Sequence, residues 1–174
     1  SLVVLFQFEG QQEHILYFSD DLALMQKDGK QVYIDRAGKT VLEPTKYYSD
    51  SGPFADGLAT VRLGLSWGYI NKAGEVVVKP VFRATRMFHE GFAAVKVADK
   101  QWCFIEHEGR LVLPANYQEA SPFSEELAAV QRNGRWGYIG KHGMQVIACR
   151  YSNVHDFADS RAAVCLYGRW GFID

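Results

Sequence analysis

The sequence predicts an all-β protein built from tandem repeats, each a three-stranded antiparallel unit. Three observations support this class: aromatic residues make up 14% of the 174 residues, glycines number 16, and one pattern returns every 34 to 36 residues. Aromatic side chains and glycines suit short strands joined by tight turns. A fixed period of about 20 to 50 residues is typical of repeat proteins, whose units bury their apolar faces against neighbouring units.

Each repeat begins with a phenylalanine in the pattern F-x-[DE]-x-x-A-x-[VM], and the segment W-[GC]-[YF]-I follows it. A glycine, a short apolar run and a tyrosine or phenylalanine complete the unit. The first repeat starts at Phe18 and has Gln31 in the tryptophan slot. We expect stacked repeats to bury the aromatic residues of this pattern. The predicted repeat core comprises Trp67, Trp102, Trp136, Trp170, Phe54, Phe88, Phe123 and Phe157.

Local patterns place three strands in each unit. Apolar residues alternate in the segments 58–61 and 67–70, which predicts the two strands of a hairpin. Asn133-Gly134 is a dipeptide that favours a type I′ turn between such strands. A longer loop ending in a left-handed glycine, as in 71–74, leads to the third strand. We expect Pro80 and its equivalents to end the pairing of that strand.

The repeats define approximate units 18–53, 54–87, 88–122, 123–156 and 157–174 within a single repeat domain, 1–174. The apolar segment 2–8 is expected to be an additional strand. An open spiral or solenoid is the predicted arrangement, with this strand as a cap. The alternative is a closed, five-bladed ring similar to a β-propeller, in which the strand would complete the last unit.

Charge and composition exclude several classes of function. Nineteen Lys and Arg against 20 Asp and Glu give a formal net charge of −1 without a basic run, so no nucleic-acid partner is expected. The longest apolar stretch at the start, 2–6, is far shorter than a membrane-spanning helix, so we also expect no membrane span. Cys103, Cys149 and Cys165 are widely spaced, which predicts free thiols.

No residue pattern predicts an enzyme, and we expect no catalytic, metal or cofactor site. An acid follows each phenylalanine after one residue. Such acids could bind Ca²⁺, but an acid that recurs in every unit is better explained as an acceptor for loop amides. Cys165 and His155 could form a nucleophile and base pair, but Cys165 occupies a slot that is polar in other repeats and is expected to face solvent. The recurring acids are Asp20, Asp56, Glu90, Glu125 and Asp159.

Three motifs, F-x-[DE]-G-L-A-x-V, G-[KR]-W-G-[YF]-I-[DN]-K-x-G and V-[IV]-x-P-x-[YF], resemble the bacterial WG-repeat family, also called KWG repeats. The resemblance covers residues 18–174 in five copies. It implies a bacterial origin, a β-rich array, and interaction rather than catalysis. Between the bacterial cytoplasm and periplasm, the cytoplasm is favoured. The sequence departs from the family pattern at Gln31, at Cys103 in place of glycine, and at Ala148 in place of proline.

These observations predict a non-enzymatic scaffold that docks another protein, as an adaptor or as a protein that neutralises its partner. The alternative is a repeat module that binds a carbohydrate or cell-wall ligand, because aromatic hairpins also line sugar-binding faces. Outward-facing residues that differ between units are the ones free to recognise a partner, and Arg and Tyr are enriched in interface hot spots. The candidate partner-binding residues are Arg62, Arg86, Met87, Phe92, Lys96, Arg132, Tyr167 and Arg169.

Overall fold

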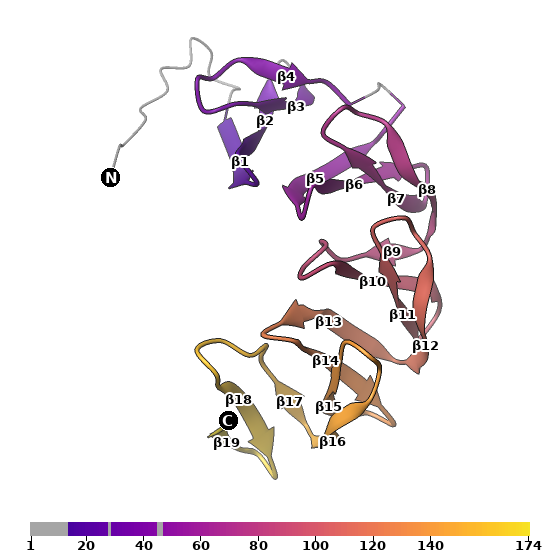
Figure 1. Ribbon diagram of the computed structural model, residues 1–174, viewed down its shortest axis with the longest axis vertical. Coiled ribbons are helices and arrows are strands. Elements are labelled where there is room, and N and C mark those ends of the chain that lie inside the picture. Colours follow the sequence, from indigo (N-terminus) through magenta and orange to yellow (C-terminus); the bar gives the residue numbers. More distant parts are fainter. Residues whose placement is uncertain (1–13, 28, 45–46) are drawn as a thin grey trace. The chain divides into compact units, whose positions relative to one another are not determined.

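The computed structural model describes residues 14–27, 29–44 and 47–174, and this part of the chain contains strands and turns but no helix (Figure 1). Its strands form five separate antiparallel sheets, each made of strands that are consecutive in the sequence. Each sheet keeps two edge strands, so none closes into a barrel. The predicted class, an all-β array of small antiparallel sheets in tandem, is confirmed.

The strands follow the repeats in order. The first sheet contains β1 (His14–Ser19), β2 (Leu22–Lys27), β3 (Lys30–Ile34) and β4 (Thr40–Leu42). The second contains β5 (Asp50–Ala55), β6 (Leu58–Leu63), β7 (Ser66–Asn71) and β8 (Val76–Phe82). The third contains β9 (Ala84–Thr85), β10 (Phe92–Ala98), β11 (Gln101–Glu106) and β12 (Leu111–Tyr117). The fourth contains β13 (Glu119–Ser124), β14 (Leu127–Arg132), β15 (Arg135–Gly140) and β16 (Gln145–Tyr151). The fifth contains β17 (Asn153–Val154), β18 (Ala162–Leu166) and β19 (Arg169–Ile173).

Four of the five sheets have one strand more than the three expected from the sequence. The extra strand lies ahead of each predicted hairpin, at β1, β5, β9, β13 and β17. In β5 the run from Asp50 to Phe54 contains Gly52 and Pro53, and its register shifts between Ser51 and Phe54. The irregularity removes the two-residue apolar period that marks a strand in sequence. The strand expected at 2–8 lies outside the described residues.

The chain divides into two compact units, Ser1–Pro80 and Val81–Asp174. In most hairpin strands of both units the middle residues are buried on both faces of the sheet, as Gly68, Tyr69 and Ile70 of β7 show, but β19 is exposed along most of its length. No helix that could cross a membrane occurs in the described ranges.

An aromatic ring two residues after the tryptophan slot packs on the phenylalanine of the following repeat. In the first unit, the Tyr33 and Phe54 ring centroids lie 4.7 Å apart. The same contact measures 5.1 Å between Phe104 and Phe123 in the second unit. Tyr33 also donates a hydrogen bond from its hydroxyl to the Gly52 carbonyl at 2.6 Å. This ring therefore joins one repeat to the next.

Tyr138 makes the equivalent contact in the second unit. Its ring centroid lies 5.0 Å from that of Phe157, and its hydroxyl donates to the His155 carbonyl at 2.8 Å. Burial raises the pKa of Tyr138 well above its ordinary value, and the nearby Asp156 carboxylate acts in the same direction. The hydroxyl therefore remains a proton donor at all physiological pH values.

The tryptophans themselves are less buried than predicted. Trp102 is 4% exposed, but Trp67 and Trp136 are half-buried, and Trp170 is 53% exposed. Each tryptophan lies near the turn of its hairpin and not at the strand centre. Trp102 is covered because it belongs to a core cluster with Tyr117 of its own sheet and Phe123 of the next, and the Arg86 guanidinium carbon also lies 5.1 Å from its ring centroid.

Trp170 is exposed because no described strand pairs with β19 on the side opposite β18. In the third and fourth sheets, Tyr117 and Tyr151 of the outer strands stand directly opposite Trp102 and Trp136.

The four phenylalanines of the predicted core are all buried, unlike the tryptophans. Their exposed fractions are 1% at Phe54, 0% at Phe88, 1% at Phe123 and 6% at Phe157.

Proline does not end the third strand, contrary to the prediction. β8 continues through Pro80, and β12 continues through residue 114. In β12 the register shifts between the pairs of Trp102 and Phe104, so the outer strand bulges there and needs no amide donor from proline. The same shift occurs opposite Trp136 in β16, where Ala148 replaces proline. The bulge therefore belongs to the repeat and does not depend on proline.

The glycine after tryptophan makes room for this bulge. A Cβ atom on Gly68 would lie 2.4 Å from the Val78 carbonyl oxygen, and one on Gly137 would lie 2.5 Å from that of Ile147. Cys103 fills the same position in the third repeat, where its thiol faces the Val95 carbonyl at 3.6 Å. In the second and fourth repeats the outer strand therefore approaches this glycine closely through its own backbone.

Candidate functional site

The recurring acids lie in tight turns in which two consecutive residues have positive φ. Asp56 and Gly57 have φ values of 51° and 81°, as a two-residue type I′ turn requires. Glycine tolerates the second position, but Asp21, Glu126 and Ser160 occupy it in other repeats, at φ values of 66°, 69° and 59°. Aspartate tolerates this left-handed conformation better than most residues, but it is unfavourable for Glu126 and Ser160.

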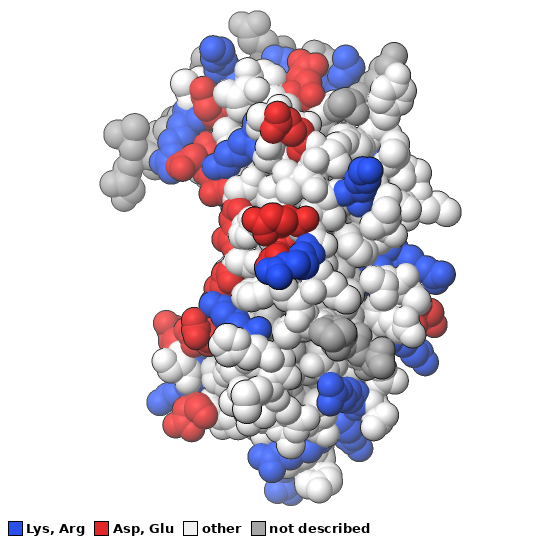
Figure 2. Space-filling view, turned by 45° about the vertical axis from the view of Figure 1, so that its right-hand side comes forward, with Lys and Arg blue, Asp and Glu red and all other residues white. Residues whose placement is uncertain are grey.

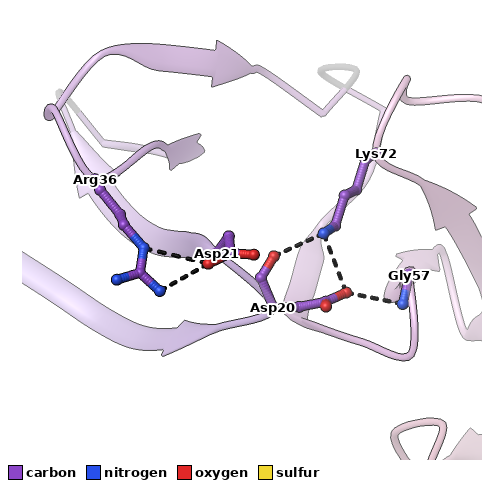
Figure 3. Close-up of polar contacts among 5 residues, drawn as sticks. All are labelled: Asp20, Asp21, Arg36, Gly57 and Lys72. Carbon is purple, nitrogen blue, oxygen red and sulfur yellow. Dashed lines mark hydrogen bonds and ion pairs between the residues drawn. The ribbon is translucent and has the colours of Figure 1, made fainter.

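In the first unit, the acid of one repeat binds the turn of the next. The Gly57 amide donates to the Asp20 carboxylate at 2.8 Å (Figure 3). Lys72 donates to the Asp20 carbonyl at 2.7 Å and lies 3.3 Å from its carboxylate. Arg36 pairs with the neighbouring Asp21 at 2.7 Å. One carboxylate thus satisfies a turn amide and a lysine from the following repeat.

The second unit contains the same arrangement. The Glu126 amide donates to the Glu90 carboxylate at 3.0 Å, and the Ser160 amide donates to Glu125 at 2.8 Å. Lys141 lies 3.1 Å from Glu90 and 3.0 Å from Glu126. These contacts agree with the interpretation of the acids as acceptors for loop amides. Among the described residues, no three His, Cys, Asp or Glu side chains are grouped so that they could hold a metal ion.

The ionisation of Glu90 reflects these contacts. Burial raises its pKa, but hydrogen bonds from Lys141 and from the amides of Glu126 and Glu125, with the Lys141 charge, lower it further than burial raises it. The pKa of Glu90 is therefore below its ordinary value. Hydrogen bonds to the Glu126 and Glu90 carboxylates raise the pKa of Lys141. Both groups are charged at neutral pH, and their role is to join two repeats.

A family model described as "WG containing repeat" matches the chain at residues 33–64, 67–100, 102–136 and 136–170. The protein belongs to this family. The four matched WG repeats begin at or near the tryptophan slot and together cover most of the chain. The copy number is close to the five predicted, and the described residues form five sheets. No curated protein matches the sequence at a significant level.

Three solved structures resemble parts of this WG-repeat protein at low identity. The first is PorZ, titled an essential bacterial surface component of the type-IX secretion system of Porphyromonas gingivalis (10% identity, TM-score 0.46, 90% of this chain and 24% of that chain). The second is KlHsv2 with loop 6CD replaced by a Gly-Ser linker (14% identity, TM-score 0.43, 68% and 44%). The third is a protein of unknown function from Bacteroides caccae (16% identity, TM-score 0.37, 83% and 65%). The chain spans less than two thirds of each of these proteins.

Several candidate partner-binding residues make contacts within the WG repeats. Phe92 is partly buried, and its ring centroid lies 5.2 Å from that of Phe123, so it belongs to the core between two repeats. It is therefore partly covered by the core and faces outward less than expected. Lys96 is also partly buried and lies 3.7 Å from the carboxylate of Asp99. Arg62 covers the ring of Trp67 at 5.6 Å.

The remaining candidates are exposed. Met87 is 44% exposed and Tyr167 is 90% exposed, and Arg86, Arg132 and Arg169 are exposed as well. Besides Arg86 on Trp102, Arg132 also stacks on an aromatic ring, with its guanidinium carbon 4.9 Å from the Tyr117 centroid. The exposed residues come from hairpin ends and from the connection before β10.

Cys165 differs from its prediction. It was expected to face solvent, but it is only 8% exposed and lies among the apolar residues of β18. The equivalent positions, Arg62, Lys96 and Gln131, are also partly buried, because this slot stands opposite the tryptophan across the hairpin. Polar residues at this position in other repeats do not indicate an exposed position, because a long side chain can bury its stem and keep its polar end in water.

Proposed function

We propose that this WG-repeat protein is a non-enzymatic scaffold that docks another protein through the ends of its hairpins. The proposal separates two sets of residues. The acid turns, the lysines bound to them and the aromatic core join repeat to repeat in the same way each time. The hairpin ends carry different side chains at equivalent positions.

The observation that carries the proposal is the conformation of Tyr167. It occupies the first position of a tight turn with a φ of 51°, followed by Gly168 at 74°, and its side chain is 90% exposed. The equivalent turn in the fourth repeat has Asn133 and Gly134 at 49° and 71°. Asparagine accepts this conformation readily, whereas a bulky tyrosine loses about 1 kcal/mol. Backbone strain occurs often at binding sites, and the exposed ring of Tyr167 is accessible to a partner.

Neighbouring side chains provide suitable chemistry for a protein partner. Arg169 begins β19 directly after the Tyr167-Gly168 turn, and Tyr and Arg are two of the residue types enriched in interface hot spots. On the face shown in Figure 2, Lys and Arg side chains are interspersed with Asp and Glu and separated by uncharged surface. Mixed charge of this kind favours a protein partner over a nucleic acid, whose backbone attracts a continuous basic surface.

A non-enzymatic role agrees with the state of the cysteines. Burial raises the pKa of the Cys103 thiol to about 11, which is the wrong direction for a nucleophile at neutral pH. Burial also raises the pKa of Cys149.

The alternative function, a carbohydrate-binding surface formed by the repeated tryptophans, receives little support, because Trp102 is buried and Trp67 and Trp136 are partly covered.

The test replaces Tyr167 with asparagine and compares stability with binding. Tyr167→Asn should raise the free energy of unfolding by about 0.5–1 kcal/mol, because asparagine is less strained in this turn. The same variant should recover less of the partner when the immobilised protein is incubated with an extract of its source cells. Leu65→Asn is a matched control, since Leu65 is another exposed apolar residue in a hairpin turn, at 83% exposure.

Recovery should be unchanged in the control. The proposal would be abandoned if wild type retained no protein from the extract, or if Tyr167→Asn retained its partner as well as wild type. Gain of stability together with loss of the partner is the result that separates a binding residue from an ordinary surface residue.

A further inference from the structure

The first repeat departs from the others where Gln31 occupies the tryptophan slot. In the third repeat, Trp102 stands opposite Tyr117 of the outer strand, which is 3% exposed. In the first repeat, the outer strand β4 ends at Leu42, and Tyr47, the counterpart of Tyr117, is 70% exposed. Gln31 provides no indole ring opposite the outer strand, as Trp102 does in the third repeat.

A cavity of about 390 Å³ lies beside Gln31. This volume falls within the range of about 300 to 1,000 Å³ that is typical of small-molecule sites. The cavity belongs to the first compact unit, and the described residues that line it lie at 26 and 29–31 in the β2–β3 hairpin and at 43–44, 48–49 and 51. The side chains at its wall include those of Gln26, Lys30, Gln31, Glu43, Tyr48 and Ser51.

Hydrogen bonds hold part of the polar wall in place. Gln31 donates from Nε2 to the Asp50 carboxylate at 3.2 Å, and the same oxygen accepts the Ser51 amide at 2.9 Å. The amide of Gln31 is therefore anchored at its donor end, and its carbonyl oxygen is the acceptor it can offer to the cavity. Gln26, which pairs with Gln31 across the hairpin, adds a second amide with both a donor and an acceptor.

One side of the cavity is aromatic. Tyr48 is partly buried and packs against the core cluster that contains Tyr33 and Phe54, and it also lines the cavity. Lys30 and Glu43 place opposite charges at the wall, so a ligand with a net charge gains little there. The wall thus combines an aromatic surface with several donors and acceptors and with balanced charge.

We propose that this cavity binds a single sugar ring of hexose size. A sugar hydroxyl can donate one hydrogen bond and accept others. It can therefore donate to the Glu43 carboxylate, accept from the Lys30 ammonium group, and do either with the amides of Gln26 and Gln31. The less polar face of a sugar ring fits the Tyr48 ring. The site is distinct from the hairpin ends proposed to dock a protein and does not depend on that proposal. The sugar is either free in solution or the terminal residue of a glycan.

The experiment uses the ¹⁵N-labelled chain and follows its glutamine side-chain amides by NMR. Glucose, galactose and N-acetylglucosamine are titrated separately, and then the methyl glycoside of the tightest binder. At least one sugar should shift the Gln26 and Gln31 signals in a saturable way, with a dissociation constant on the order of 1 mM. Binding of the methyl glycoside would identify a glycan terminus, whereas binding of the free sugar alone would identify a free ligand.

Gln31→Trp restores the residue of the other repeats and should fill the cavity. It is expected to weaken binding at least about tenfold, while the amide spectrum elsewhere shows that the protein remains folded. Glu43→Gln removes one charged acceptor and should weaken binding several-fold without filling the space. Gln145→Trp is the matched control, because Gln145 is exposed and does not line the cavity.

Binding that is unchanged in Gln31→Trp would overturn the proposal. So would a titration in which none of the three sugars shifts the Gln26 and Gln31 signals. Glycine is included as a zwitterionic probe of similar polarity. Saturable binding of glycine without binding of any sugar would also overturn the proposal, because it would assign Lys30 and Glu43 to a charged ligand.

Discussion

Replacing Glu90 with alanine removes the contact that joins the third repeat to the fourth. Its carboxylate accepts the Glu126 amide at 3.0 Å and lies 3.1 Å from the Lys141 ammonium group. A hydrogen bond to a charged group contributes about 1.5–3 kcal/mol, and an exposed ion pair adds less than about 1 kcal/mol. Since 25% of the Glu90 side chain is exposed, the lower part of this range applies. We expect Glu90→Ala to lower the free energy of unfolding by about 2 kcal/mol at pH 7.

The effect should depend on pH with a defined sign. The pKa of Glu90 in the folded protein lies below its ordinary value because Lys141 and two turn amides favour the carboxylate. A group whose pKa is lowered by folding contributes stability above its unfolded pKa, about 4.3 for glutamate, and this contribution is lost as pH falls through the folded pKa. The difference in stability between wild type and Glu90→Ala should therefore shrink between about pH 5 and pH 3.

Denaturation by urea, followed by tryptophan fluorescence at several pH values, measures this difference. Glu90→Gln should lose about half as much stability as Glu90→Ala, because its amide oxygen can still accept the Glu126 hydrogen bond. Glu108→Gln is the control, since Glu108 is exposed in a loop and should change stability by less than about 0.5 kcal/mol. A Glu90→Ala effect that is absent at pH 7, or undiminished at pH 3, would refute the argument.

Three further outcomes follow from burial and hydrogen bonding. Trp102→Ala should cost about 3–5 kcal/mol in chemical denaturation, whereas Trp170→Ala should cost less than about 1 kcal/mol, because the first ring is 4% and the second 53% exposed. Equal losses would contradict this reading of burial. Tyr138→Phe should cost about 1–2 kcal/mol by the same measurement, since the partly buried His155 carbonyl loses its donor; no loss would show that water replaces the hydroxyl. With its pKa near 11, Cys103 should react with iodoacetamide at pH 8 only after unfolding, as peptide mass spectrometry can detect, and rapid labelling of the native protein would contradict its burial.

The period of the sequence predicted the repeat units, the hairpins and the family, because these depend on local patterns that return in every copy. Turn residues illustrate this: Asn133-Gly134 predicted a turn in which both residues have positive φ, and both do. The role of the recurring acids was also accessible from sequence, since a feature that returns with the repeat is expected to serve it. The acid of one repeat does accept an amide from the next at Asp20, Glu90 and Glu125.

Other features depended on position within a strand and on neighbours distant in sequence. The tryptophan slot predicted burial, but the ring two residues later is the one at the strand centre, as Tyr138 shows at 0% exposure. The extra strand at β5 lacked an apolar period, and Phe92 was assigned to the surface although it packs on Phe123.

The amino-acid sequence alone therefore determined the repeated unit and its turns, because backbone preferences and apolar periodicity act over a few residues. Only the tertiary structure decided which aromatic rings are enclosed and where a repeat leaves a space, because burial depends on what a neighbouring repeat places against each side chain. Gln31 illustrates the difference: its departure from the repeat pattern is evident in the sequence, whereas the cavity beside it is evident only in the structure.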